Sequence, residues 1–132
     1  MDNQIVVAVK GVIIRDGKWL IIKRSDSDDI GAGTWETPGG RVDFGECPEE
    51  ALVREIQEEV GLDATVDGIL YASSFMSNPF RQVIIIHYRC AVPQGNVSLS
   101  DEHSDYLWAT KEELVQRLPP TILTNFQKCK VI

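Results

Sequence analysis

The chain has 132 residues, of which 43% are hydrophobic and 25% are charged, and this suits one soluble domain with a buried core. Its formal net charge of −7 argues against binding to nucleic-acid polymers or anionic membranes, because both need basic patches. The three cysteines are odd in number and widely spaced, and no segment is long and apolar enough to span a bilayer. We therefore expect a single cytoplasmic domain over residues 1–132.

The first part of the chain predicts a β-hairpin, then a loop and a short extended piece. Residues 5–14 are rich in Val and Ile, and residues 19–22 are apolar again. Asp16-Gly17 in the turn between these two runs is a strong hairpin signal. Residues 25–33 are polar and predict a loop, and residues 41–44 predict a short extended segment.

A helix is predicted between Pro48 and Gly61. Proline suits the first turn of a helix, the acidic residues after it favour the positive end of the helix dipole, and glycine is typical of a C-terminal cap. The helical period places one set of apolar residues on a common face: Leu52, Val53, Ile56 and Val60. A separate arc carries three carboxylates, from Glu55, Glu58 and Glu59.

The second part of the chain predicts two strands and two helices. The strands span residues 69–75 and 82–92, and the run 83–86 is typical of a strand covered on both faces. A polar loop over 93–105 precedes helices over 111–118 and 121–128, which are separated by Pro119-Pro120. Strands on both sides of a central helix, with helices at the end, predict an α/β fold of the mixed sandwich type.

The three carboxylates stand at i, i+3 and i+4, so a helix brings them together on one face. Clustered carboxylates repel one another, and a hard divalent cation such as Mg²⁺ offsets this repulsion because it takes oxygen ligands. The spacing alone also fits an ordinary solvated acidic face. The residues around the three glutamates decide between these two interpretations.

The run from Gly40 to Leu62 resembles the signature box of the Nudix hydrolase family. Glycine, glutamate, the Arg-Glu pair, the Glu-Glu pair and the second glycine all stand at the spacing of that box: Gly40, Glu46, Arg54, Glu55, Glu58, Glu59 and Gly61. The preceding W-x-x-P-G-G and a late Trp108 before a helix are also similar to the small MutT-like members. The resemblance implies an α/β/α sandwich with a mixed β-sheet and a pyrophosphohydrolase that depends on Mg²⁺, with Mn²⁺ as an alternative ion.

The resemblance also implies a role for each matching residue. The carbonyl of Gly39 and the carboxylates of Glu55, Glu58 and Glu59 match metal ligands of the family. Gly40, Glu46 and Gly61 match structural positions, and a carboxylate that holds the Arg54 guanidinium would orient the helix glutamates. The expected catalytic residues are Glu55, Glu58, Arg54 and Glu102.

The residue that accepts a proton from the attacking water stays open between a box glutamate and Glu102. Glu102 lies six residues before Trp108, as a loop glutamate does in small members that degrade nucleoside triphosphates. A solvated acidic loop is the simpler interpretation of this segment. The neighbouring His103 is a further candidate, because an ordinary imidazole titrates near neutral pH.

The box indicates the reaction, hydrolysis of a nucleoside diphosphate linked to another group, but leaves the substrate open. The chain length and the spacing of Glu102 and Trp108 favour a nucleoside triphosphate that yields the monophosphate and pyrophosphate. Pro79 resembles a proline of ADP-ribose hydrolases, so ADP-ribose or a nucleotide sugar is the second interpretation, and a nucleotide sensor without turnover is the third. Candidate substrate contacts are Arg24, Trp35 and Phe80, and pairing of two chains into a homodimer stays open.

Overall fold

The computed structural model describes residues 2–26 and 31–132, and its strands form one mixed sheet. The strands are β1 (Gln4–Arg15), β2 (Lys18–Arg24), β3 (Trp35–Glu36), β4 (Gly39–Arg41), β5 (Thr65–Asn78), β6 (Arg81–Ala91) and β7 (His103–Ala109). Their order is β3-β2-β1-β6-β5, with β4 paired to β1 and β7 paired to β2. β1 and β6 are parallel, and the other pairings are antiparallel.

The predicted β-hairpin between β1 and β2 is confirmed. Ile14 pairs with Trp19, and Asp16 and Gly17 form the turn with φ angles of 54° and 73°. Two successive residues with positive φ are typical of the two-residue turn that matches the twist of the flanking strands. The loop predicted over 25–33 falls partly outside the described residues, at 27–30.

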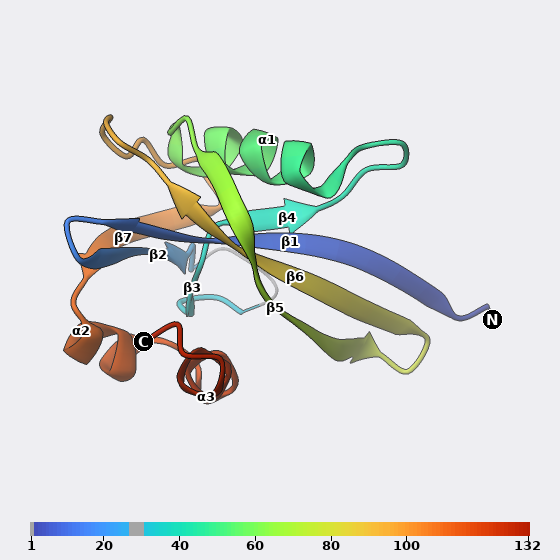
Figure 1. Cartoon of the computed structure of the whole chain (residues 1–132). Helices are drawn as coiled ribbons and strands as arrows, with labels where there is room; N and C mark the ends of the chain where they lie inside the picture. The colour runs from blue at the N-terminus through green and yellow to red at the C-terminus, as the bar shows by residue number, and fades with distance from the viewer. Residues whose placement is uncertain (1, 27–30) are drawn as a thin grey trace.

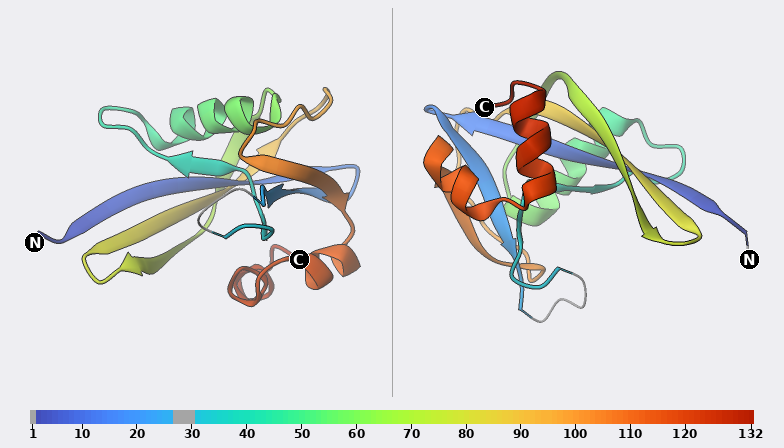
Figure 2. Two further views of the ribbon diagram at one scale, coloured as in Figure 1. Left: turned by 180° about the vertical axis from the view of Figure 1, so that it is seen from behind. Right: turned by 90° about the horizontal axis from the view of Figure 1, so that it is seen from below.

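The helices cover both faces of the sheet, which confirms the α/β/α sandwich. The helix α1 (Pro48–Val60) lies on one face, and α2 (Lys111–Arg117) and α3 (Pro120–Lys128) lie on the other (Figure 1). The view from below in Figure 2 shows α3 across the sheet, with α2 beside it. A buried apolar cluster fills each of the two layers, one under α1 and one under α2 and α3. None of the helices within residues 2–26 and 31–132 is both long and apolar enough to cross a membrane.

Two differences from the sequence prediction concern β7 and α1. Residues 103–105, predicted as the end of a polar loop, form the start of strand β7, because β7 pairs with β2 from Trp19 to Arg24. Val53, predicted to share the apolar face of α1, is 38% exposed. It lies one position further around the helix than Leu52, at the rim of the buried face.

Candidate active site

The helix α1 carries three glutamates whose side chains range from buried to exposed. It begins at Pro48 and ends at Gly61, whose φ is 70° and whose N–H bonds to the carbonyl of Gln57. Glu59 is only 6% exposed, whereas the side chains of Glu55 and Glu58 are 17% and 58% exposed. The glutamates therefore differ in environment although they share one helix.

A bidentate ion pair fixes the guanidinium of Arg54 beside this helix. Its Nε donates to Glu46 Oε2 at 2.8 Å and its Nη2 donates to Glu46 Oε1 at 2.9 Å. The Arg54 hydrogen bonds hold the pKa of Glu46 down at about 2. The third nitrogen, Nη1, donates to Glu55 Oε1 at 2.9 Å and lies 3.5 Å from Glu58. The geometry has the form of the predicted Arg54–Glu46 pair, and it orients the Glu55 carboxylate.

The glycines of β4 bring the backbone against the glutamates. Gly39 N–H donates to Glu59 Oε1 at 2.7 Å, in a buried hydrogen bond. Gly39 has a φ of +154°, and a Cβ there would run into the carbonyl oxygen of Val9. A Cβ on Gly40 would overlap the carboxylate of Glu55. Position 39 therefore needs glycine because backbone atoms approach it closely, whereas the obstacle at Gly40 is the end of the Glu55 side chain.

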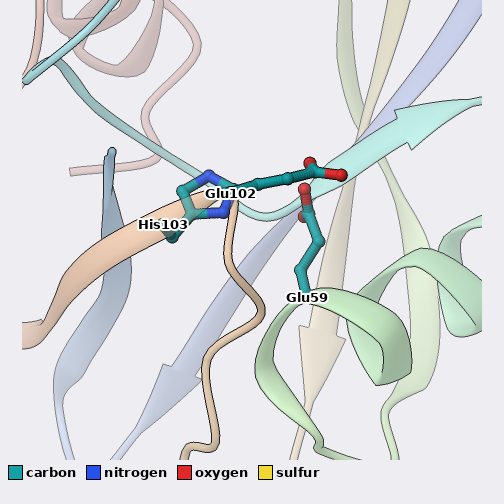
Figure 3. Close-up of side chains that lie close together, drawn as sticks. All are labelled: Glu59, Glu102 and His103. Atoms are coloured by element: carbon teal, nitrogen blue, oxygen red, sulfur yellow. The ribbon is translucent and has the colours of Figure 1, made fainter. Parts of the chain in front are cut away.

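A distant loop brings Glu102 to the same helix end. Ser98 N–H donates to the carbonyl of Val60 at 2.8 Å, and Ser100 N–H donates to the carbonyl of Glu59 at 3.1 Å. The chain that follows these two hydrogen bonds places Glu102 and His103 beside Glu59. Ligand atoms of Glu59, Glu102 and His103 lie within 4.8 Å of one another, and Figure 3 shows the two carboxylates side by side. The structure thus brings Glu102 together with the box, as the resemblance implied.

A partly buried charged network contacts this cluster through His103 and was not predicted from the sequence. Lys10 Nζ donates to Glu36 Oε1 at 3.2 Å and to the carbonyl of Thr37 at 3.1 Å. Burial alone would raise the pKa of Glu36, but the hydrogen bond with His103 and the charges of Lys10 and Arg24 lower it to about 2. One signal was present in the sequence: Lys10 is the one charged residue within the run 5–14 that is rich in Val and Ile.

The three predicted substrate contacts lie in different surroundings. Arg24 is close to the cluster, because it pairs with His103 across β2 and β7 and its Nη1 lies 3.4 Å from Glu36 Oε2. Trp35 packs against the apolar layer under α3, with the guanidinium of Arg117 5.8 Å from its ring centroid. Phe80 lies in the β5–β6 turn, where its carbonyl accepts from Gln4 N–H at 2.7 Å. All three roles stay predictions.

The donor set at the end of α1 fits a hard divalent cation. Burial raises the pKa of Glu55, although the hydrogen bond from Arg54 acts in the opposite direction. Burial also raises the pKa of Glu59 to about 7, despite the Lys10 charge and the Gly39 N–H. Carboxylates that are clustered and desolvated in this way are stabilised by a cation that takes oxygen ligands. The Glu55, Glu58 and Glu59 carboxylates and the Gly39 carbonyl stay the predicted ligands of such an ion.

Glu59→Gln is expected to stabilise the metal-free protein at alkaline pH. A carboxyl with a pKa of about 7 in the folded state and about 4.3 unfolded binds more protons when folded, so unfolding free energy falls as pH rises between these values. Gln cannot ionise but can still accept from Gly39 N–H. Urea denaturation in EDTA should show the variant about 3 kcal/mol more stable at pH 8, with little difference at pH 4. Equal pH dependence of both proteins between pH 4 and 8 would contradict the prediction.

The sandwich fold and the carboxylate cluster at the end of α1 define the class of the protein: an α/β/α sandwich with an acidic site suited to a divalent cation. A family model described as the NUDIX domain matches residues 5–127. The chain belongs to the Nudix family and is a Nudix hydrolase, an enzyme for nucleoside diphosphates linked to another group. Nudix enzymes generally need a divalent metal ion.

Individual relatives agree with this assignment. The chain is 36% identical over 114 residues to a CTP pyrophosphohydrolase of Escherichia coli (strain K12), covering 86% of this chain and 82% of that protein. It is 34% identical over 113 residues to a MutT-like protein of Streptomyces ambofaciens, covering 85% of this chain and 68% of that protein. The crystal structure of a MutT protein from Methanosarcina mazei Go1 matches with a TM-score of 0.88 at 27% identity, covering 98% and 96% of the two chains.

Proposed function

We propose that the protein hydrolyses a nucleoside triphosphate to the monophosphate and pyrophosphate, with Mg²⁺ as its cofactor. The observation that carries the proposal is the buried Glu59, which accepts a hydrogen bond from Gly39 N–H and lies close to Glu102. Arg54 on the same helix is fixed by its ion pair with Glu46. The name of the relative that is 36% identical, a CTP pyrophosphohydrolase, supports a triphosphate substrate.

The residues divide into three proposed roles. Glu55, Glu58, Glu59 and the carbonyl of Gly39 hold the cation, which when bound neutralises phosphate charge and lowers the pKa of a bound water. Arg54 orients the Glu55 carboxylate and keeps it from rotating away. The proposed structural supports are Gly40, Glu46 and Gly61.

The chemical step needs a carboxylate that takes a proton from water as its oxygen attacks phosphorus and pyrophosphate leaves. Glu55, Glu58 and Glu102 are the candidates for this base. Glu102 is exposed, yet its carboxylate is close to the buried Glu59. This combination of access to water and closeness to the cluster favours Glu102 as a base or as a further ligand.

The alternative substrates are ADP-ribose and nucleotide sugars. The sequence feature behind that alternative is Pro79, which follows Asn78 in the β5–β6 turn. Asn78 Oδ1 accepts from Phe80 N–H at 2.8 Å across Pro79, so Pro79 lies in a locally stabilised turn, where proline is common for structural reasons. The triphosphate proposal is preferred for this reason.

A nucleotide panel with Mg²⁺ tests the proposal. The protein would be incubated with each nucleoside triphosphate, ADP-ribose and a nucleotide sugar, and ³¹P NMR would identify the products. We expect monophosphate and pyrophosphate from at least one triphosphate, at a higher kcat/KM than for the other two classes. Faster turnover of ADP-ribose or the nucleotide sugar would contradict the proposal that a nucleoside triphosphate is the substrate. Nucleotide binding with no turnover of any compound would instead support a sensor.

A further inference from the structure

One ring nitrogen of the His103 side chain has a hydrogen-bond partner, and the other has none among the described residues. His103 begins strand β7, and only 2% of its side chain is exposed. Its Nε2 lies 2.8 Å from Glu36 Oε2, whereas its Nδ1 is buried and has no hydrogen-bond partner among the described residues. Burying a polar atom without a partner is unfavourable, so a ligand for Nδ1 is expected.

The charges around Glu36 determine which nitrogen of His103 carries the proton. Glu36 accepts from Lys10 Nζ and has Arg24 Nη1 3.4 Å away, so it is an anionic acceptor. A carboxylate can only accept hydrogen bonds, and therefore His103 Nε2 must be the donor. In the neutral ring, this leaves Nδ1 with a free lone pair.

The imidazole of His103 belongs to a cluster with two carboxylates. Ligand atoms from Glu59, Glu102 and His103 lie within 4.8 Å of one another, and Figure 3 shows the imidazole beside the paired carboxylates. A histidine that binds a metal almost always donates its other N–H to a carboxylate or carbonyl, as His103 does to Glu36. The cluster thus has both the ligand atoms and the outer carboxylate of a mixed oxygen and nitrogen site.

We propose that His103 Nδ1 is a cation ligand together with Glu59 and Glu102, and that Glu36 is the positioning residue that orients the ring. The inference rests on the proposed function, because Glu59 also belongs to the proposed cation site on α1. A nitrogen ligand from His103 would shift the ion preference of that site away from Mg²⁺. Imidazole nitrogen favours ions such as Co²⁺, Ni²⁺ and Zn²⁺, whereas Mg²⁺ prefers oxygen and keeps several waters.

Metal titrations of the purified full chain test this preference. His103→Gln retains an amide N–H that can reach Glu36, but it offers only an amide oxygen and no nitrogen lone pair in place of Nδ1. Calorimetry should show at least a tenfold loss of Co²⁺ affinity and less than about a threefold loss of Mg²⁺ affinity. The matched control is His87→Gln, which changes the buried histidine of β6 that lies outside the cluster. An equal loss for both ions, or no loss for Co²⁺, would overturn the proposal.

A direct measurement on the unmodified protein does not depend on any variant folding. Electron spin-echo modulation of the Mn²⁺-loaded chain should show coupling to a directly bound ¹⁴N nucleus, which is lost in His103→Gln and kept in His87→Gln. Absence of this coupling from the wild type, while the wild type still hydrolyses nucleotides with Mg²⁺, overturns the inference and leaves the proposed function intact. A wild type with the coupling and no nucleotide hydrolysis would contradict the proposed function alone.

Discussion

Replacing Glu58 with Gln is expected to lower kcat for nucleotide hydrolysis by about 10²–10⁴-fold, the contribution typical of a positioned proton-transfer group. In the proposed site, Glu58 is a cation ligand and a candidate base, and Gln loses the negative charge that both roles need. Folding should be unaffected to within about 0.5 kcal/mol, because the Glu58 side chain is 58% exposed and lies 3.5 Å from Arg54 in a surface pair. Steady-state kinetics at saturating Mg²⁺ would measure kcat, and thermal denaturation would measure the change in stability.

The control for this variant is Glu50→Gln, the same chemical change on an exposed residue in the first turn of α1. Its kcat should equal that of the wild type. If Glu58→Gln at saturating Mg²⁺ keeps the activity of this control, the assignment of Glu58 to the site is wrong.

Gly39→Ala should be strongly destabilising, with a loss of about 3–5 kcal/mol in the free energy of unfolding. A Cβ at this position would run into the carbonyl oxygen of Val9 and come within 2.8 Å of Lys10 Cα. Both atoms belong to the backbone of β1, so no side chain can rotate away to relieve the clash. Urea denaturation would measure the loss.

Gly45→Ala separates this clash from the effect of backbone conformation. Gly45 also has a positive φ, at +83°, but a Cβ there would have nothing within 4 Å. We expect a cost of about 1–2 kcal/mol, the strain of a left-handed residue alone. Equal losses for the two alanine variants would show that the approach of β4 to β1 does not limit stability.

The helix that carries the box could be predicted closely because its signals are local. Pro48 marks its start and Gly61 its end, and both limits agree with the structure. The Asp16-Gly17 hairpin was predictable for the same reason, since two residues determine the turn. The resemblance to the Nudix box then supplied the family from a contiguous run of residues.

The surroundings of the box could not be predicted, because they depend on contacts between distant residues. The Glu36–His103 hydrogen bond joins positions 67 residues apart, and the Lys10–Glu36 bond joins positions 26 apart. His103 stands in a polar run that predicted a loop, and only its pairing with β2 places it in a strand and buries it. No local pattern in the sequence contains this information.

The two backbone hydrogen bonds from Ser98 and Ser100 to the end of α1 have a consequence for protein engineering. They attach the segment before Glu102 to the helix that carries Glu59, so segments far apart in sequence are held side by side. A designer could lengthen the exposed stretch 93–96 without moving Glu102, because the path is fixed again at Ser98. Inserting a residue between Ser98 and Glu102 would shift that carboxylate, so a graft of this loop onto another scaffold should begin at Ser98 and include the end of α1.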